Sequence, residues 1–290
     1  MIRVDAHQHF WKLSRNDYGW LTQREYPSLY RDFMPDDLAP HLKRSGVDRT
    51  VVVQAATSDA ETAFLLELSS TTPFIAGVVG WTDLESRDAV PKIESLACNR
   101  HLLGLRPMLQ DLPDDEWLLR PSIEPAIAAM KRANLRFDAL VKPRHLAMLL
   151  RFLQRHSDLD VVIDHGAKPP IETGAIDEWA TQIRDIAAHT NAFCKLSGLA
   201  TQAGAGWTLD TLKPYADVLI DAFGAPRLMW GSDWPVLQQG YDATTDAMPY
   251  GSWLKTAAHL VDELASDDRD WIFGKTASLF YGIDQSTRSS

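Results

Sequence analysis

Two histidines separated by one residue stand near the beginning of the chain. The segment 4–10 reads VDAHQHF, an apolar lead-in that runs directly into His7 and His9. In a β-strand the side chains at positions i and i+2 lie on the same face, so the two imidazoles would face one point. Imidazole nitrogens bind zinc at ~2.0–2.1 Å. The pair is therefore a candidate for part of a metal site, and the remaining ligands must come from elsewhere in the chain.

The elements that would position this pair alternate between short apolar segments and amphipathic ones. The apolar segments, which we predict to be strands, cover 4–10, 50–55, 74–81, 102–106, 137–141, 160–165, 192–197 and 227–233. Helices are predicted over 35–46, 61–68, 89–98, 124–133, 145–156, 176–188 and 209–223, and two closing helices over 253–265 and 268–281.

Eight strand–helix units in a chain of 290 residues predict an α/β fold, a single-domain (β/α)8 barrel of the TIM type spanning 1–290. An open doubly wound sheet is the alternative, but such a sheet usually carries a glycine-rich phosphate loop after its first strand. Here the two histidines occupy that place. The connection over 11–34 is long and rich in aromatic residues, and loops of this length inside a domain are usually functional.

The composition excludes several classes of partner. The formal net charge is −10, and the sequence contains no basic block, which argues against nucleic acid and against an anionic membrane. There are only two cysteines and no apolar segment long enough for a signal peptide or a membrane span. These features predict a cytoplasmic monomer or small homo-oligomer whose partner is a small molecule.

Polar residues gather where the predicted strands end. In (β/α)8 barrels the active site forms at the carboxyl ends of the strands. The residues at those positions are His7, His9, Trp81, Arg106, Lys142, His145, His165, Lys195, Ser197 and Asp233. Four of the nine histidines are among them, although the strand interiors are almost entirely apolar. This contrast indicates an enzyme.

Each of these residues also has a purely structural interpretation. Asp233 could cap a turn, and His165 could be a buried histidine bonded to the backbone. Arg106 could serve only an ion pair, and Lys142 could be a solvated loop residue. His145 could equally begin the following helix.

Four motifs resemble those of a known family. They are DAHQHFW at 5–11, DHGAKP at 164–169, GSDWP at 231–235 and FGKTASLFYG at 273–282. Together they are similar to the amidohydrolase superfamily, and more narrowly to its lactonase branch of sugar-lactone and 2-pyrone-4,6-dicarboxylate hydrolases. The resemblance extends over the whole chain.

The resemblance implies a deformed (β/α)8 barrel that holds one divalent metal, zinc before others, or works without one. The positions that match metal ligands are His7, His9, His165 and Asp233. A binuclear centre is not expected, because the fourth strand ends in Arg106 where a bridging carboxylated lysine would be needed.

The expected activity is hydrolysis of an aldonolactone, such as an L-fucono- or L-rhamnono-lactone, to the sugar acid. Asp233 would take a proton from the attacking water and return it to the ring oxygen, while His165 polarises the carbonyl. The residues predicted to bind the substrate are Arg106, Lys142, His145, Trp81 and Trp207. The cationic side chains would bond hydroxyl groups or the oxyanion, and the tryptophans would offer flat apolar faces to the sugar.

Two other functions fit the same residues. One is a metal-dependent, non-oxidative decarboxylase of an aromatic or muconate-type acid, which would need a carboxylate-binding clamp beside the metal. The other is a non-catalytic sugar- or metal-binding protein.

Overall fold

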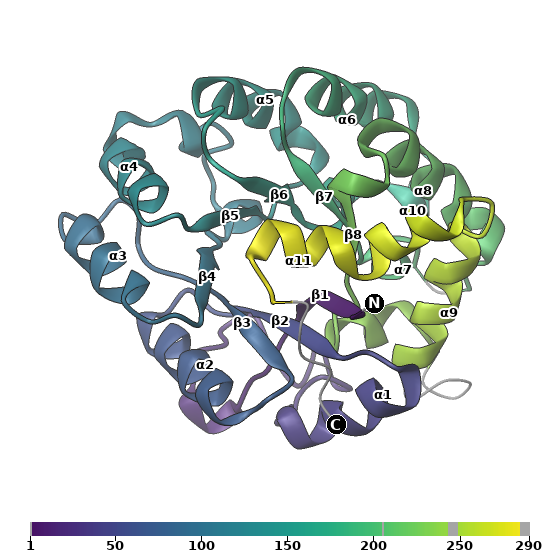
Figure 1. The fold of residues 1–290 in the computed structure, drawn as a ribbon, viewed down its shortest axis with the longest axis horizontal. Coiled ribbons are helices and arrows are strands. Elements are labelled where there is room, and N and C mark those ends of the chain that lie inside the picture. The colour runs from purple at the N-terminus through teal and green to yellow at the C-terminus, as the bar shows by residue number, and fades with distance from the viewer. Residues whose placement is uncertain (1, 205, 243–248, 285–290) are drawn as a thin grey trace.

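Eight parallel strands form one sheet in which each strand pairs with the next along the chain (Figure 1). The computed structural model describes residues 2–204, 206–242 and 249–284. The strands are β1 (Val4–Gln8), β2 (Arg49–Val53), β3 (Ile75–Gly80), β4 (Leu102–Leu105), β5 (Arg136–Ala139), β6 (Val161–Ile163), β7 (Phe193–Leu196) and β8 (Leu228–Trp230). The predicted barrel is therefore confirmed. The observed strands are shorter than the predicted ones because the polar residues at their carboxyl ends already belong to the loops.

Helices surround the sheet on its outer side (Figure 1). They are α1 (Pro35–Ser45), α2 (Asp59–Thr71), α3 (Ala89–Ala97), α4 (Glu124–Arg132), α5 (Leu146–Arg155), α6 (Asp177–His189), α7 (Leu199–Gln202), α8 (Leu209–Phe223), α9 (Tyr250–Leu260), α10 (Ser266–Asp270) and α11 (Thr276–Tyr281). Helix α1 begins at a proline and stops before Gly46, whose φ of 62° favours glycine. A π-helical turn over Trp271–Lys275 joins α10 to α11, so the last predicted helix is one interrupted run.

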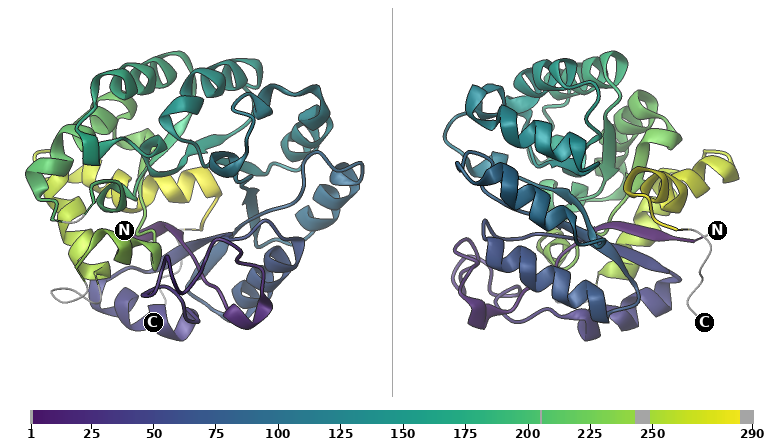
Figure 2. Two further views of the ribbon diagram at one scale, coloured as in Figure 1. Left: turned by 180° about the vertical axis from the view of Figure 1, so that it is seen from behind. Right: turned by 60° about the vertical axis from the view of Figure 1, so that its left-hand side comes forward.

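Helix α11 covers one end of the barrel, and the long first loop lies at the opposite end (Figures 1 and 2). The barrel interior is a small apolar core in which Val51, Val79 and Val162 pack with Phe280 and Tyr281 of α11. The larger core lies between the outer face of the sheet and the helices. Because apolar side chains close the α11 end, a polar site that is open to solvent can form only at the opposite end.

The first loop folds back on itself as a closed unit. Trp11 and Phe33 exchange two backbone hydrogen bonds of 3.0 Å at its base. Inside the loop the ring of Trp20 packs edge-on against Tyr26 at 5.4 Å, and its Nε1–H donates to the carbonyl of Ala55 at 2.7 Å. These bonds fix the two aromatic rings over the carboxyl end of the barrel.

Strands β1 and β8 meet without a regular ladder. Two backbone bonds join the end of β1 to the segment that follows β8, from the Asp233 N–H to the His7 carbonyl (2.8 Å) and from the His9 N–H to the Trp234 carbonyl (2.7 Å). The buried Asp5 carboxylate reinforces this seam, because it accepts the Ser232 N–H at 2.8 Å and the Tyr250 hydroxyl at 2.9 Å. The Asp5 side chain and the two backbone bonds therefore together hold the two ends of the sheet against each other.

We expect Asp5→Asn to change how stability depends on pH. Burial raises the pKa of Asp5 to about 6, although hydrogen bonds from Ser232, His7 and Tyr250 oppose the shift. The folded state thus retains a proton that the unfolded state releases above pH ~4, and stability from this group is lost as the pH rises to about 6. Urea unfolding at pH 4.5 and 7 should show a loss of about 2 kcal/mol in the native protein that the variant lacks. Equal pH slopes in both proteins would contradict this account.

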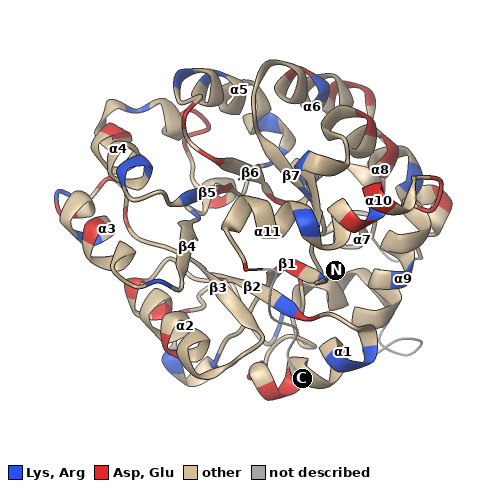
Figure 3. Cartoon of the chain, in the orientation of Figure 1, with Lys and Arg blue, Asp and Glu red and all other residues tan. Residues whose placement is uncertain are grey.

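Acidic and basic residues are both distributed over the outer helices in the view of Figure 3. Within the described residues, none of the helices is both long and apolar enough to span a membrane.

Candidate active site

Three side chains from the two sides of the β1–β8 seam converge on one point. The Nε2 atoms of His7 and His9 are 3.2 Å apart, and Asp233 Oδ1 lies 3.3 Å from the His9 nitrogen and 3.8 Å from the His7 nitrogen. A triangle with these sides has a centre about 2.0 Å from every corner, and zinc binds nitrogen and oxygen at ~2.0–2.2 Å. The three atoms therefore fit a single metal ion, and they form one of the two buried ligand groups found among the described residues.

The surrounding groups turn the correct nitrogens toward this point. His9 Nδ1 lies 2.8 Å from the carbonyl oxygen of Val53, which fixes the ring proton there and leaves the lone pair on Nε2. His7 Nδ1 lies 3.4 Å from Asp164 Oδ1 and 3.1 Å from the Lys195 ammonium, so these two groups hold that edge of the ring and leave Nε2 facing the point. Burial lowers the pKa of His7 well below its ordinary value, against the opposing effect of Asp164. A neutral imidazole is the form that binds a metal.

His165 approaches the same carboxylate from β6. Its Nε2 lies 3.9 Å from Asp233 Oδ1, and its Nδ1 is bonded to the Ser197 hydroxyl at 2.8 Å. Gly198 leaves room for the ring, since a Cβ at that position would lie 2.7 Å from His165 Nδ1. Burial lowers the pKa of His165 to about 4, with Asp233 opposing the shift. His165 is therefore neutral at physiological pH.

The carboxylate of Asp233 stays ionised in this setting. Burial by itself would raise its pKa, but its interactions with His165, His9 and His7 outweigh that effect and hold the pKa below its usual range. The backbone of Asp233 has a φ of 57°, in the left-handed region that aspartate tolerates better than most residues. An ionised, sharply oriented carboxylate at the floor of a pocket can accept a proton from water.

A network of buried charges supports the site from below. The Lys195 ammonium lies 2.5 Å from Asp138, 3.0 Å from Asp164 and 3.1 Å from His7 Nδ1. Arg106 contacts the other oxygen of Asp164 at 3.2 Å. Two cations thus balance two carboxylates, and Lys195 and both aspartates are fully buried. The Tyr281 hydroxyl donates to Asp138 at 2.8 Å, so the network reaches from α11 to the candidate metal ligands.

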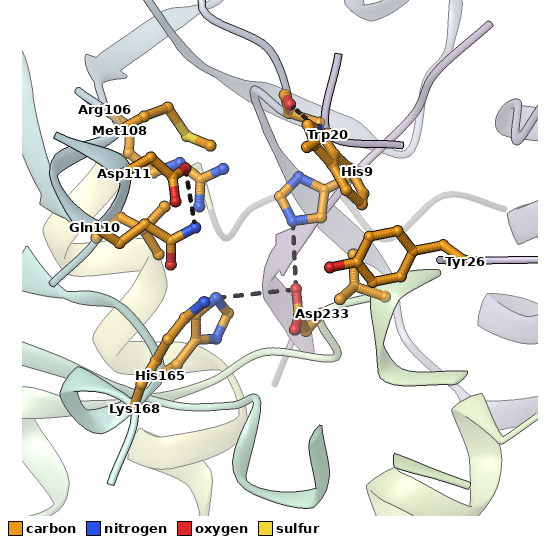
Figure 4. A pocket seen from close by; sticks show the side chains of 13 residues that line it. His9, Trp20, Tyr26, Arg106, Met108, Gln110, Asp111, His165, Lys168 and Asp233 are labelled. Atoms are coloured by element: carbon orange, nitrogen blue, oxygen red, sulfur yellow. Dashed lines mark hydrogen bonds and ion pairs between the residues drawn. The ribbon is translucent and has the colours of Figure 1, made fainter. Parts of the chain in front are cut away.

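A pocket opens above Asp233 (Figure 4). Its residues come from the first loop, from the loops after β2, β4, β5 and β6, and from the segment after β8. They are His9, Trp20, Tyr26, Ala55, Arg106, Met108, Gln110, Asp111, Leu140, His165, Lys168, Asp233 and Val236. The volume of ≈ 250 Å³ suits a small molecule. Its wall combines two aromatic rings with several polar groups.

Comparison with known proteins identifies the family of this chain. An amidohydrolase family model matches residues 4–283. The chain belongs to the amidohydrolase family. A curated relative from Burkholderia ambifaria named L-fucono-1,5-lactonase is 49% identical, over 98% of this chain and 97% of the relative. A second protein of that name, from Burkholderia multivorans, is 32% identical over 98% and 97% of the two chains.

A solved amidohydrolase from Burkholderia multivorans, described as having bound zinc, is 32% identical. The match covers 98% of this chain and 100% of that chain with a TM-score of 0.88. The predicted membership of the amidohydrolase superfamily is therefore confirmed.

The structure brings some of the predicted site residues of this amidohydrolase together and leaves others apart. His7, His9, His165 and Asp233 form the cluster, and Arg106 lines the pocket beside them.

Lys142, His145, Trp81 and Trp207 are not among the pocket-lining residues. His145 Nδ1 accepts the backbone N–H of Lys142 at 3.0 Å, and Nε2 pairs with Asp115, as expected of a residue that begins the next helix. Trp207 donates to the Gly240 carbonyl at 2.6 Å. Substrate binding by these four residues stays a prediction.

Several residues of the pocket and of the buried network beneath it were not assigned a role from the sequence. Lys168 lies within the DHGAKP motif, and its position three residues after His165 could have indicated a place near the site. Asp164 could also have been found, as the polar residue that directly ends an apolar strand. Gln110 and Asp111 lie in a short 3-10 helix (Leu109–Asp111) that follows β4 by a few residues, and no periodic pattern in the sequence marks them.

Proposed function

We propose that this enzyme hydrolyses a sugar-derived lactone, of the 1,5-aldonolactone class to which L-fucono-1,5-lactone belongs, to the open-chain sugar acid. The observation that carries the proposal is the Asp233 carboxylate facing three imidazoles at the floor of a pocket. The amidohydrolase from Burkholderia ambifaria that shares 49% of its sequence supports the substrate class.

The reaction needs a water molecule that loses a proton as it attacks the lactone carbonyl. Asp233 is the proposed base, because it is ionised, buried and within the reach of a water placed in the pocket. The water oxygen forms a bond to the carbonyl carbon, and the carbonyl π electrons move to its oxygen. When that pair returns, the bond to the ring oxygen breaks. The ring oxygen leaves with the bonding electrons and takes the proton back from Asp233.

The same residues are suited to hold one divalent metal, for which we propose zinc. The ligands would be His7, His9 and Asp233, with His165 next to them. When bound, the metal would supply Lewis acidity toward the carbonyl and lower the pKa of a bound water. The residues of the chain contribute orientation and proton transfer: His165 points Nε2 into the pocket, because its Nδ1 is bonded to Ser197.

The wall of the pocket suits a polyhydroxylated ring. Trp20 and Tyr26 present apolar ring faces and edges, which commonly pack against sugars. Gln110 and Asp111 offer a carboxamide and a carboxylate for hydroxyl groups from the opposite wall.

A pH-indicator screen over aldonolactones tests the proposal directly. We expect acid release with a subset of six-carbon lactones that stops in Asp233→Asn, and zinc near one equivalent by metal analysis. The screen is run before and after chelation, which measures whether the metal is required. Asp221→Asn, on the exposed face of α8, is the matched control. Release of carbon dioxide from aromatic acids would support the decarboxylase instead, and binding of sugars or zinc without acid release would indicate a binding protein.

A further inference from the structure

Lactone hydrolysis creates negative charge on a molecule that begins neutral. Charge first develops on the carbonyl oxygen and then remains on the product carboxylate. A cation that serves this charge must line the pocket and must not already be neutralised by a protein carboxylate.

Two of the buried cations do not meet this requirement. Arg106 lines the pocket, but its guanidinium is paired with Asp164 at 3.2 Å and donates to the carbonyl of Gln54. Lys195 is fully buried beneath the site and is held by Asp138 and Asp164. Both cations act within the protein, and their charge is already balanced.

Lys168 has a different environment. It lines the pocket with His165 and Asp233, and within the part of the chain that the structure describes its amine takes part in no ion pair or hydrogen bond. Figure 4 shows Lys168 and His165 pointing into the pocket from the same side, opposite His9. Burial lowers the pKa of the Lys168 amine, while the charge of Asp233 opposes the shift.

The backbone that carries Lys168 is strained in a way that directs this side chain. Residues 165–168 all have positive φ, with 55° at His165, 56° at Gly166, 62° at Ala167 and 54° at Lys168. The turn is closed by the Lys168 N–H, which donates to the His165 carbonyl at 2.9 Å. Three non-glycine residues in this region cost about 1–2 kcal/mol each. Strain of this size at a pocket is typical of functional positions.

We propose that the Lys168 ammonium is the anion-binding group of this site, bonding the carbonyl oxygen as it becomes negative and then the product carboxylate. This inference rests on the proposed lactone hydrolysis. Lys168 donates a hydrogen bond and keeps its proton throughout, so the proton transfer remains with Asp233. Because the lactone is neutral and the oxyanion is charged, the ammonium stabilises the transition state more than the bound substrate.

This difference between neutral and charged species gives the test. In Lys168→Met we expect kcat to fall by about 10²–10³, as when an oxyanion-hole donor is removed. KM for the neutral lactone should change by no more than about threefold, because no charge is recognised in the ground state. Calorimetry should show the sugar acid L-fuconate, and the small anion acetate, binding at least about tenfold more weakly. Lys168→Arg, which keeps the charge, should recover part of kcat and of the anion affinity.

Lys43→Met, on the exposed face of α1, is the control and should match the native protein in every measurement. Unfolding in urea identifies a folding defect, which would weaken lactone and anion binding together. Equal anion affinity in the native protein and Lys168→Met would overturn the anion site, and so would an unchanged kcat. If the native protein hydrolyses no lactone, the proposed function fails, and the acetate titration still decides whether Lys168 binds anions.

Discussion

Asp233→Asn should lower kcat for lactone hydrolysis by about 10³ while the barrel remains folded. Removing a general base typically costs 10²–10⁴ in rate, and here the same carboxylate also returns the proton to the ring oxygen. Asparagine preserves the backbone bond from Asp233 to His7 that helps to close the barrel, so the unfolding curve should change little.

The experiment needs a measurement that separates the proton-transfer role from metal binding. Steady-state kinetics with the best aldonolactone should therefore be paired with zinc analysis of the same protein. A variant that retains zinc and loses kcat identifies the base, whereas loss of both identifies a ligand. Retention of native kcat in Asp233→Asn would exclude the role as base, and retention of zinc would show that the carboxylate is not needed as a ligand.

Lys195→Met should have the largest effect on stability of the changes considered. It leaves the carboxylates of Asp138 and Asp164 buried without their shared cation, and Arg106 can serve only one of them. Breaking a buried pair by removing one partner typically costs about 3–5 kcal/mol. Urea unfolding should show a loss of this size, or the variant should fail to accumulate as a folded protein.

A compensating double variant keeps this prediction testable even if the single variant does not fold. Lys195→Met combined with Asp138→Asn removes one cation and one anion, and it should recover a substantial part of the lost stability. Lys213→Met removes a half-exposed lysine of α8 that is paired with Asp217, and it should cost less than about 1 kcal/mol. A Lys195→Met protein as stable as the native one would show that the network does not contribute to folding.

Much of the fold could be predicted because each unit repeats a local signal. A buried parallel strand is a continuous apolar run, and the helix that follows it is amphipathic, so the alternation is visible without long-range information. The polar residues that end those runs are equally visible, which is why His7, His9, His165 and Asp233 could be named together.

The direction in which a loop side chain points could not be predicted from local sequence patterns. Lys142 and Lys168 both follow strands, yet Lys142 does not line the pocket, and a run of positive φ values places Lys168 in its wall. The sequence pattern does not predict four consecutive positive φ values at 165–168, because only one of these four residues is glycine. The partner of Arg106 is likewise Asp164, which is 58 residues away and becomes a neighbour only when the barrel closes.

The seam between β1 and β8 also determines when the site can exist during synthesis. His7 and His9 belong to the first strand region of the barrel to be made, and Asp233 is 224 residues behind His9. The Asp233 carboxylate cannot meet them before the segment after β8 has been made, and α11, which fills the opposite end, is made later still. The cluster of His7, His9 and Asp233 is therefore among the last contacts of the barrel that a growing chain can form. Until then the two histidines lie at the unpaired edge of an incomplete sheet. A metal ion bound to them at that stage would lack the Asp233 carboxylate as a ligand.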